Sequence, residues 1–165
     1  MEYRYLVLAA VLASIPAAAE EVQFEGHAIE VDASQEARNI LRMTGTRYGV
    51  RGSAAQIIDK ARQCIGSGRG FTLESTDPAN GKLSANGRFD YRQLWSTHSV
   101  RARLTIEADD GHFRLVQSEL GHAQGSGAET PDAGYSPISQ ENDDWREALA
   151  ATIEAETRLV DCMYR

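Results

Sequence analysis

Positive charge is scarce in this sequence. Its 17 lysine and arginine residues face 24 aspartate and glutamate residues, which gives a formal net charge of −7 at pH 7. Proteins that bind nucleic acids neutralise backbone phosphates with lysine and arginine, whereas a uniformly acidic chain repels such a backbone. We therefore expect no nucleic-acid partner.

Long hydrophobic runs are also scarce, and the clearest one lies near the N-terminus. Residues 6–15 are mostly apolar, follow Arg4 and precede the small residues at 17–19. A helix needs about 20 apolar residues to span a membrane, so this run is too short for an anchor. A basic residue, a short apolar run and a small-residue end are typical of a secretory signal peptide. We interpret residues 1–19 as a signal peptide cleaved before Glu20, and expect a periplasmic or secreted protein without a transmembrane anchor after cleavage.

Cysteine occurs only twice, as Cys64 and Cys162. In an oxidising compartment two cysteines can form one disulfide. They can also be two buried thiols that pack as small apolar residues. Geometry decides between these possibilities, because a disulfide needs Cα atoms within about 7 Å of each other. The sequence leaves both open. No cysteine lies near the expected cleavage site, so we expect no lipid anchor.

Common catalytic and metal-binding motifs are missing as well. The sequence has no H-E-x-x-H, no G-x-S-x-G and no Ser-x-x-Lys motif. Asp109, Asp110 and His112 lie close together, but a metal needs three or four converging ligands, and adjacent residues in a tight turn rarely converge. We interpret them as a hairpin turn, and expect no metal and no cofactor. We interpret each of the four histidines as an exposed polar residue: His27, His98, His112 and His122.

Residues 53–66 have the pattern of an amphipathic helix. Ser53 is a good N-cap and Gly66 a good C-terminal stop. Between them, apolar residues recur at helical spacing and form one stripe: Ile57, Ile58, Ala61, Cys64 and Ile65. The glycine-rich run at 66–70 is not a phosphate-binding loop, because it leaves a helix, enters a strand and lacks the Gly-Lys-Ser/Thr ending.

Alternation of apolar and polar residues with a period of two predicts strands after this helix. The strongest runs are residues 82–92, 99–108 and 112–120, preceded by a short extended segment at 71–76. Turn chemistry separates the runs, as D-P-A-N-G before the first and D-D-G before the last. We predict an antiparallel meander with one buried face and one solvent-exposed face.

The remaining segments complete a predicted α+β fold. Residues 20–44 form an N-terminal extension or an extra strand, and residues 45–165 form a single α+β domain. Within it, residues 121–141 are rich in Gly, Ser and Pro and predict a long loop, and a final amphipathic helix begins after Asn142. We predict an antiparallel sheet of about 4–5 strands with two helices packed on one face.

Three stretches within residues 45–120 share features with a known family. They are V-R-G-S-A-A-Q-I-I-D-K-A, D-P-A-N-G-K-L-S-A-N-G-R-F-D-Y and V-R-A-R-L-T-I-E-A-D-D-G-H-F-R-L. The shared features are a Gly-Ser helix start, a Gly-Lys-hydrophobic pair before a strand glycine, and a D-G-x-aromatic-R hairpin. In these the chain resembles the bacterial family called domain of unknown function 4468, whose members are typically exported and have a TBP-like fold. The resemblance implies that fold and no catalytic residues, and a TBP-like shape does not imply DNA binding.

Four arginines lie on the predicted solvent-exposed face of two neighbouring strands. If these strands form a hairpin through residues 93–98, the arginines cluster beside Tyr91 and Trp95. Arginine with exposed aromatic residues is typical of binding surfaces. The alternative is ordinary cross-strand pairing with Asp90 and Glu107. The candidate binding residues are Arg88, Arg92, Trp95, Arg101 and Arg103.

These observations favour a small exported domain without catalytic activity. We hypothesise that it binds an unknown envelope protein or ligand, or has a structural role in the envelope. The alternative is a secreted hydrolase, or an inhibitor of one, that uses the loop at 121–141. An enzyme needs a pocket where a histidine and a carboxylate converge, whereas a binding module needs an exposed aromatic or apolar patch.

Overall fold

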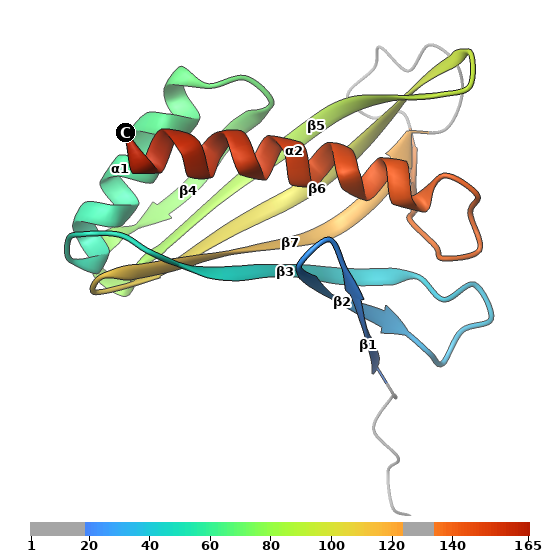
Figure 1. The fold of residues 1–165 in the computed structure, drawn as a ribbon, viewed down its shortest axis with the longest axis horizontal. Helices are drawn as coiled ribbons and strands as arrows, with labels where there is room; N and C mark the ends of the chain where they lie inside the picture. The colour runs from blue at the N-terminus through green and yellow to red at the C-terminus, as the bar shows by residue number, and fades with distance from the viewer. Residues whose placement is uncertain (1–18, 124–133) are drawn as a thin grey trace, which may run out of the picture.

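The structure is a computed structural model that describes residues 19–123 and 134–165 (Figure 1). Nearly all of the expected signal peptide, residues 1–19, lies outside the described residues, and Ala19 begins the first strand. The elements are β1 (Ala19–Phe24), β2 (His27–Asp32), β3 (Ile40–Gly49), α1 (Ala54–Ser67), β4 (Phe71–Asp77), the 3₁₀ turn η1 (Pro78–Asn80), β5 (Lys82–Gln93), β6 (Ser96–Asp109), β7 (His112–Ala123), β8 (Tyr135–Pro137) and α2 (Trp145–Tyr164).

The strands of the described residues form one antiparallel sheet of eight strands. The order is β1-β2-β3-β7-β6-β5-β4, and β8 pairs with β7. This sheet is larger than the predicted 4–5 strands. One reason is that residues 20–44, expected as an extension or an extra strand, contribute β1, β2 and the first part of β3. A turn at Glu25 and Gly26, both with positive φ, joins β1 to β2.

The loop expected at 121–141 is shorter in the structure, because strands occupy both of its ends. Residues 121–123 complete β7, and Tyr135–Pro137 form β8, which pairs with them. A strand of three residues is too short to reveal itself by alternation in the sequence. The middle of the expected loop, residues 124–133, lies outside the described residues.

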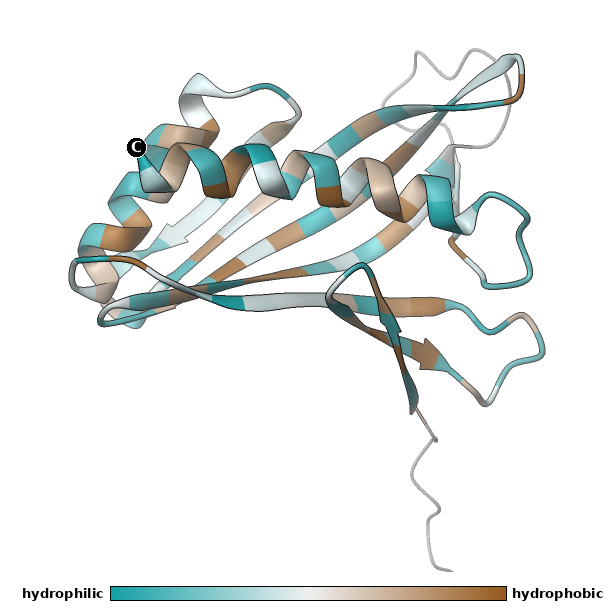
Figure 2. Ribbon diagram, viewed as in Figure 1, coloured by the Kyte–Doolittle hydropathy of each residue, from teal (hydrophilic) through white to brown (hydrophobic). Residues whose placement is uncertain are grey.

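The central strands alternate as the sequence predicts. On β5, the side chains of Leu83, Ala85, Phe89 and Tyr91 are buried, and the intervening side chains are half-buried or exposed. Figure 2 shows hydrophobic and hydrophilic positions alternating along this part of the sheet. The buried stripes of α1 and α2 share two core clusters with these strand residues. Burying each large apolar side chain contributes roughly 1.5–3 kcal/mol, so these clusters hold the helices to the sheet.

Helix α1 begins at its predicted cap and receives a second cap from a distant turn. The Ser53 hydroxyl accepts a hydrogen bond from the backbone N–H of Gln56, whose side chain accepts from the backbone N–H of Ser53. In the β6–β7 turn, Oδ1 of Asp110 accepts a hydrogen bond from the Ala54 N–H at 2.9 Å. Gly111 in that turn has a φ of 81°. The turn interpretation is confirmed, and the carboxylate of Asp110 caps a helix.

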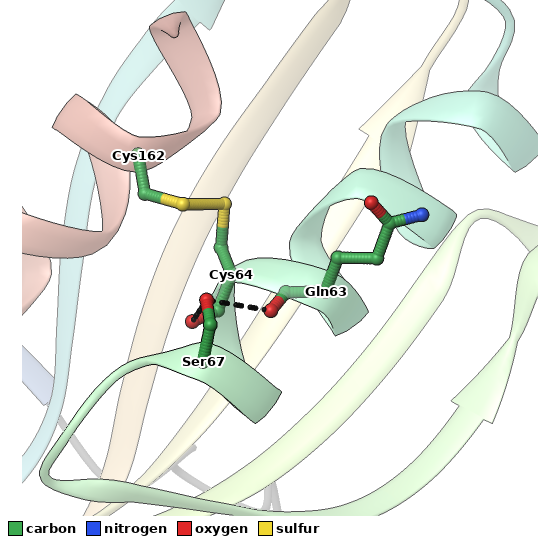
Figure 3. Close-up of a disulfide and its surroundings, with 4 residues drawn as sticks. All are labelled: Gln63, Cys64, Ser67 and Cys162. Atoms are coloured by element: carbon green, nitrogen blue, oxygen red, sulfur yellow. Dashed lines mark hydrogen bonds between the residues drawn. A yellow bond between two sulfur atoms is a disulfide. The ribbon is translucent and has the colours of Figure 1, made fainter.

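A disulfide joins the C-terminal ends of the two helices (Figure 3). The Cα atoms of Cys64 and Cys162 lie 5.9 Å apart and their sulfur atoms are bonded. Of the two possibilities left open by the sequence, the structure therefore has the disulfide. The bonded residues are 98 positions apart in the sequence. Closing a loop of that size stabilises the folded chain by about 4–5 kcal/mol in the chain-entropy model.

Candidate functional site

The β5–β6 hairpin carries all five residues of the candidate binding set. Arg88 lies directly opposite Arg101 in the strand register, and Arg92 lies opposite Thr97, nearer the hairpin turn. The arginines alternate with buried residues, so they occupy the face of the hairpin that points away from the core. Trp95 lies in the turn itself. The structure therefore brings Arg88 and Arg101 together and spaces the others along the hairpin.

Neighbouring side chains hold several of these arginines. The guanidinium of Arg103 is 2.9 Å from a carboxylate oxygen of Glu74 and 3.2 Å from one of Glu119. The guanidinium of Arg101 lies over the Tyr135 ring, 4.5 Å from its centre. Arg88 donates to the Ser99 hydroxyl at 3.3 Å. Arg103 therefore pairs with acidic residues on other strands, as the alternative to a binding surface describes. Its partners are Glu74 and Glu119, whereas Asp90 and Glu107 were expected.

Asp90 and Glu107, the acidic residues of the cross-strand alternative, each contact a side chain outside the predicted set. Asp90 accepts a hydrogen bond from the Ser99 hydroxyl. Glu107 pairs with Arg114 on β7, at 2.6 Å between a guanidinium nitrogen and a carboxylate oxygen. Of the predicted set, Arg92 and Trp95 remain as exposed residues at the outer end of the hairpin. The candidate surface is thus the end of the hairpin.

The hairpin turn presents two apolar side chains to solvent. Gln93 and Ser96 pair across the strands, so Leu94 and Trp95 form a two-residue turn. Leu94 is 92% exposed and Trp95 is 101% exposed. In Figure 1 this end of the β5–β6 hairpin projects beyond the body of the sheet. We call Leu94 and Trp95 the hairpin tip.

Leu94 adopts a backbone conformation that leucine rarely takes. Its φ is 53°, in the left-handed region that two-residue hairpin turns require. Asn, Asp or Gly normally occupies such a position because the left-handed conformation costs other residues roughly 1–2 kcal/mol. The tip thus combines local strain with full exposure of two large apolar side chains, and neither feature stabilises the isolated domain.

A cluster of polar side chains lies further down the hairpin, around Tyr91. The Tyr91 hydroxyl donates to Oδ2 of Asp144 at 2.5 Å and lies 2.9 Å from Nδ1 of His122. With its proton directed to Asp144, this hydroxyl accepts from a protonated Nδ1 of His122. The Nε2 atom of His122 is buried without a hydrogen-bond partner among the described residues, 3.7 Å from Oδ1 of Asp144.

Burial sets the pKa values in this cluster. It raises the pKa of Tyr91 far above its usual value, and the hydrogen bond to Asp144 raises it further. Burial also lowers the pKa of His122, and the Asp144 carboxylate opposes that shift. His122 is therefore a neutral base next to a carboxylate near pH 7. Among the described residues no serine hydroxyl or cysteine thiol hydrogen-bonds to His122.

The interpretation of every histidine as an exposed residue was wrong for His27, which is buried, and for His98 and His122, which are half-buried. His27 is 6% exposed, and its Nε2 lies 3.1 Å from Oε1 of Glu156. His122 lies in β7 with its ring half-buried, and His98 stacks on Tyr91 with ring centres 5.5 Å apart. His112 is exposed, as expected.

Sequence reasoning missed a buried polar cluster centred on Glu156. This residue is 1% exposed and accepts hydrogen bonds from Gln117 at 2.9 Å and from the Tyr48 hydroxyl at 3.4 Å. The hydrogen bond that the imidazole donates to Glu156 raises the pKa of His27, and burial of the ring opposes this shift. The available signal was the position of Glu156 within the apolar stripe of the last helix. A carboxylate at such a position needs buried partners.

The described residues give no sign of a metal centre or of a membrane span. No group of three or more His, Cys, Asp or Glu side chains in residues 19–123 and 134–165 could hold a metal ion. Within the same residues, no helix is both long and apolar enough to cross a membrane.

Comparison with known proteins identifies the fold. No family model matches the sequence, and no curated protein matches it. A TBP-like protein from Parabacteroides distasonis is 9% identical with a TM-score of 0.52, over 74% of this chain and 91% of its own. A DUF4468 family protein from Bacteroides ovatus is 9% identical with a TM-score of 0.55, over 87% of this chain and 90% of its own. At this identity the likeness shows the fold alone, and it confirms the TBP-like α+β fold implied by the sequence resemblance.

Proposed function

We propose that this chain, a TBP-like α+β domain, is an exported binding module that docks on a partner protein of the bacterial envelope through its hairpin tip. The observation that carries the proposal is the full exposure of Leu94 and Trp95 in a strained two-residue turn. The partner has an apolar pocket for the tip, and acidic side chains border that pocket. The module itself carries out no catalysis.

The apolar part of the tip supports a protein partner. Tryptophan is among the residues that contribute most to protein–protein interfaces, where it fills a pocket on the other protein. Burying a large apolar side chain such as that of Leu94 contributes roughly 1.5–3 kcal/mol. The two-residue turn is closed by the pairing of Gln93 with Ser96, which shortens the segment that must be ordered on binding. The tip therefore has the composition of an interface anchor.

The charge beside the tip supports an acidic rim on the partner. Arg92 is exposed two positions before Leu94, and Arg88 and Arg101 lie further along the same face. The chain as a whole carries a net charge of −7, so this basic segment stands out against an acidic background. Complementary charge at a rim mainly raises the association rate and selects the partner.

The test uses capture followed by a purified pair. The chain from Glu20 onward is used as bait in envelope extract, and the captured protein is purified and titrated by calorimetry. We expect Trp95→Ala to weaken binding at least roughly 30-fold, as loss of an interface anchor worth about 2 kcal/mol does. Arg92→Glu should slow association, most clearly at low salt.

The matched control is Leu73→Ala on β4, because Leu73 is another large apolar side chain that is 40% exposed. This variant should bind like the unchanged chain. Equal capture by the Trp95→Ala and Leu73→Ala variants would show that the tip is not the docking site. A crosslinker placed at position 95 should also join the partner, and its failure to do so would count against the proposal.

The His122–Asp144 pair favours a second candidate, the secreted hydrolase or hydrolase inhibitor that uses residues 121–141. His122 is a neutral base at one end of that segment, with Nδ1 2.9 Å from the Tyr91 hydroxyl and Nε2 3.7 Å from Oδ1 of Asp144. The test is hydrolysis of a panel of ester and peptide substrates by the full chain and by His122→Gln. Activity that is lost in His122→Gln would support the hydrolase. If neither the full chain nor His122→Gln hydrolyses any substrate of the panel, a hydrolase acting on those substrates is excluded.

A further inference from the structure

A cavity of about 620 Å³ lies between the C-terminal end of α1, the start of β4 and α2. In Figure 1 α1 and the C-terminal end of α2 lie at the end of the molecule away from the projecting tip of the β5–β6 hairpin. The cavity wall includes Ile65, Phe71 and Leu159, together with the disulfide between Cys64 and Cys162. A volume of this size is within the range of small-molecule sites, which are mostly apolar with a few polar groups.

The polar groups of this cavity are mainly two arginines. Arg69 follows α1 and is exposed, and no hydrogen bond or ion pair joins it to another of the described residues. Arg158 on α2 pairs with Glu154 one turn earlier, at 2.5 Å, and its side chain is 57% exposed. An exposed ion pair of this kind contributes little, so a carboxylate ligand can replace Glu154 at small cost.

The carbonyl groups at the end of α1 do not stand in the way of an anion. A free helix C-terminus carries partial negative charge and repels anions. Here the Gly68 N–H donates to the carbonyls of Cys64 and Ile65, and the Ser67 hydroxyl donates to the carbonyl of Gln63 (Figure 3). These donors offset the negative end of the helix, and the charged side chains that line the cavity are those of Arg69 and Arg158.

Two glycines leave room for the aromatic rings beside the cavity. Phe71 packs edge-on against Phe89, with ring centres 5.1 Å apart. A Cβ atom at Gly87 would lie 2.9 Å from the Phe71 ring, and one at Gly70 would lie 2.8 Å from the Phe89 ring. The absence of side chains at these two positions therefore leaves room for the rings of Phe71 and Phe89.

We propose that this cavity binds an amphiphilic carboxylate, a molecule of the medium-chain fatty-acid class. Its alkyl chain lies against Phe71, Leu159 and the disulfide, and its carboxylate lies between Arg69 and Arg158. Guanidinium groups bind carboxylates through charge-assisted hydrogen bonds, and the apolar wall favours the tail. The disulfide links both walls, since Cys64 is on α1 and Cys162 is on α2. This site is independent of the proposed docking at the hairpin tip.

The test is titration of the full chain with dodecanoate below its micellar concentration, followed by calorimetry and amide chemical shifts. Dodecanol supplies the same tail without the charge, and acetate supplies the charge without the tail. We expect dodecanoate to bind at least about tenfold more tightly than dodecanol, since the difference is the loss of a charge-assisted hydrogen bond. Acetate should not bind measurably. The shifted amides should lie in α1, β4 and α2.

Paired variants locate the carboxylate. Replacing both Arg69→Gln and Arg158→Gln should weaken dodecanoate binding at least about tenfold and leave dodecanol binding unchanged. Arg62→Gln is the matched control, because Arg62 is an exposed arginine of α1 in a similar local ion pair with Asp59. It should bind dodecanoate normally.

Three results would overturn the proposal. The first is no binding of dodecanoate to the unchanged chain. The second is equal affinity for dodecanoate in the double variant and in Arg62→Gln. The third is tighter binding of a short peptide ending in phenylalanine than of dodecanoate, which would assign the cavity to peptide C-termini.

Discussion

The imidazole of His27 and the carboxylate of Glu156 meet in the core, 3.1 Å apart, although 129 positions separate them in the chain. Their side chains are 8% and 2% exposed. His27 begins β2 and Glu156 lies in the middle of α2, so this contact ties the N-terminal strands to the final helix. Two small strands at the edge of the sheet are thereby held by a buried polar contact as well as by strand pairing.

Glu156→Ala should destabilise the protein by about 3–5 kcal/mol, because removing one partner of a buried pair leaves the other partner unsatisfied. Here both His27 and Gln117 would lose their acceptor. Urea unfolding gives the free-energy change directly. Glu154→Ala is the control, since its side chain is 73% exposed. A change under about 0.5 kcal/mol is expected for that surface position.

The His27 contact should stabilise the protein more at low pH than at high pH. The folded-state pKa of His27 lies above its usual value of 6.5, chiefly because of the hydrogen bond with Glu156. A group with a raised pKa in the folded state contributes its full stabilisation below the unfolded pKa, and loses it as the pH rises through the folded pKa. The destabilisation caused by His27→Gln should therefore be largest and constant below about pH 6.5, and shrink as the pH rises from there through the folded pKa. If the unfolding free energies of the unchanged chain and of His27→Gln differed by the same amount at every pH, the raised pKa of His27 would be contradicted.

Gly45→Ala should destabilise the fold through the same cluster. A Cβ atom at Gly45 would lie 2.6 Å from Oε1 of Glu156, closer than atoms can pack. The expected loss is about 1–3 kcal/mol, typical of overpacking in a core. Gly49→Ala on the same strand is the matched control, because a Cβ atom there meets nothing within 4 Å. Equal melting temperatures for the two variants would show that Glu156 moves aside freely.

Leu94→Gly should stabilise the isolated domain and weaken partner binding. Glycine adopts the φ of 53° at this position without strain, so the turn loses a cost of roughly 1 kcal/mol. Thermal unfolding of the free chain measures the first effect, and titration of the purified partner measures the second. A variant that gains stability and keeps full affinity would mean that Leu94 has no part in binding.

The sequence predicts the centre of the fold well, because the signals there are local. Leu83 and Phe89 alternate with polar residues along β5, and Ser53 caps α1 where its pattern begins. The Asp110–Gly111 turn between β6 and β7 is likewise a short-range signal. Two features could not be predicted from local signals. Strand β8 is too short to show alternation. The disulfide between Cys64 and Cys162 requires two residues 98 positions apart in the sequence to come together in the fold.

The candidate site is less predictable than the fold, because its features depend on contacts between distant residues. Trp95 was expected near a turn, but its full exposure and the strain at Leu94 follow from the register in which Gln93 pairs with Ser96. The binding role of the arginine set stays a prediction. The alternation pattern also does not reveal that Arg103 pairs with acidic residues on β4 and β7. The burial of His27 could not be predicted, because it depends on where α2 places Glu156.

The disulfide has a consequence for how the molecule would respond to a protease. Strands β4, β5, β6, β7 and β8 all lie between Cys64 and Cys162 in the chain. A single cut anywhere in that span, including at the exposed bond between Leu94 and Trp95, leaves two fragments covalently joined. The nicked molecule would keep its intact mass plus one water until a reductant separates the pieces. The bridge thus allows the projecting hairpin to be cleaved without releasing either half of the sheet.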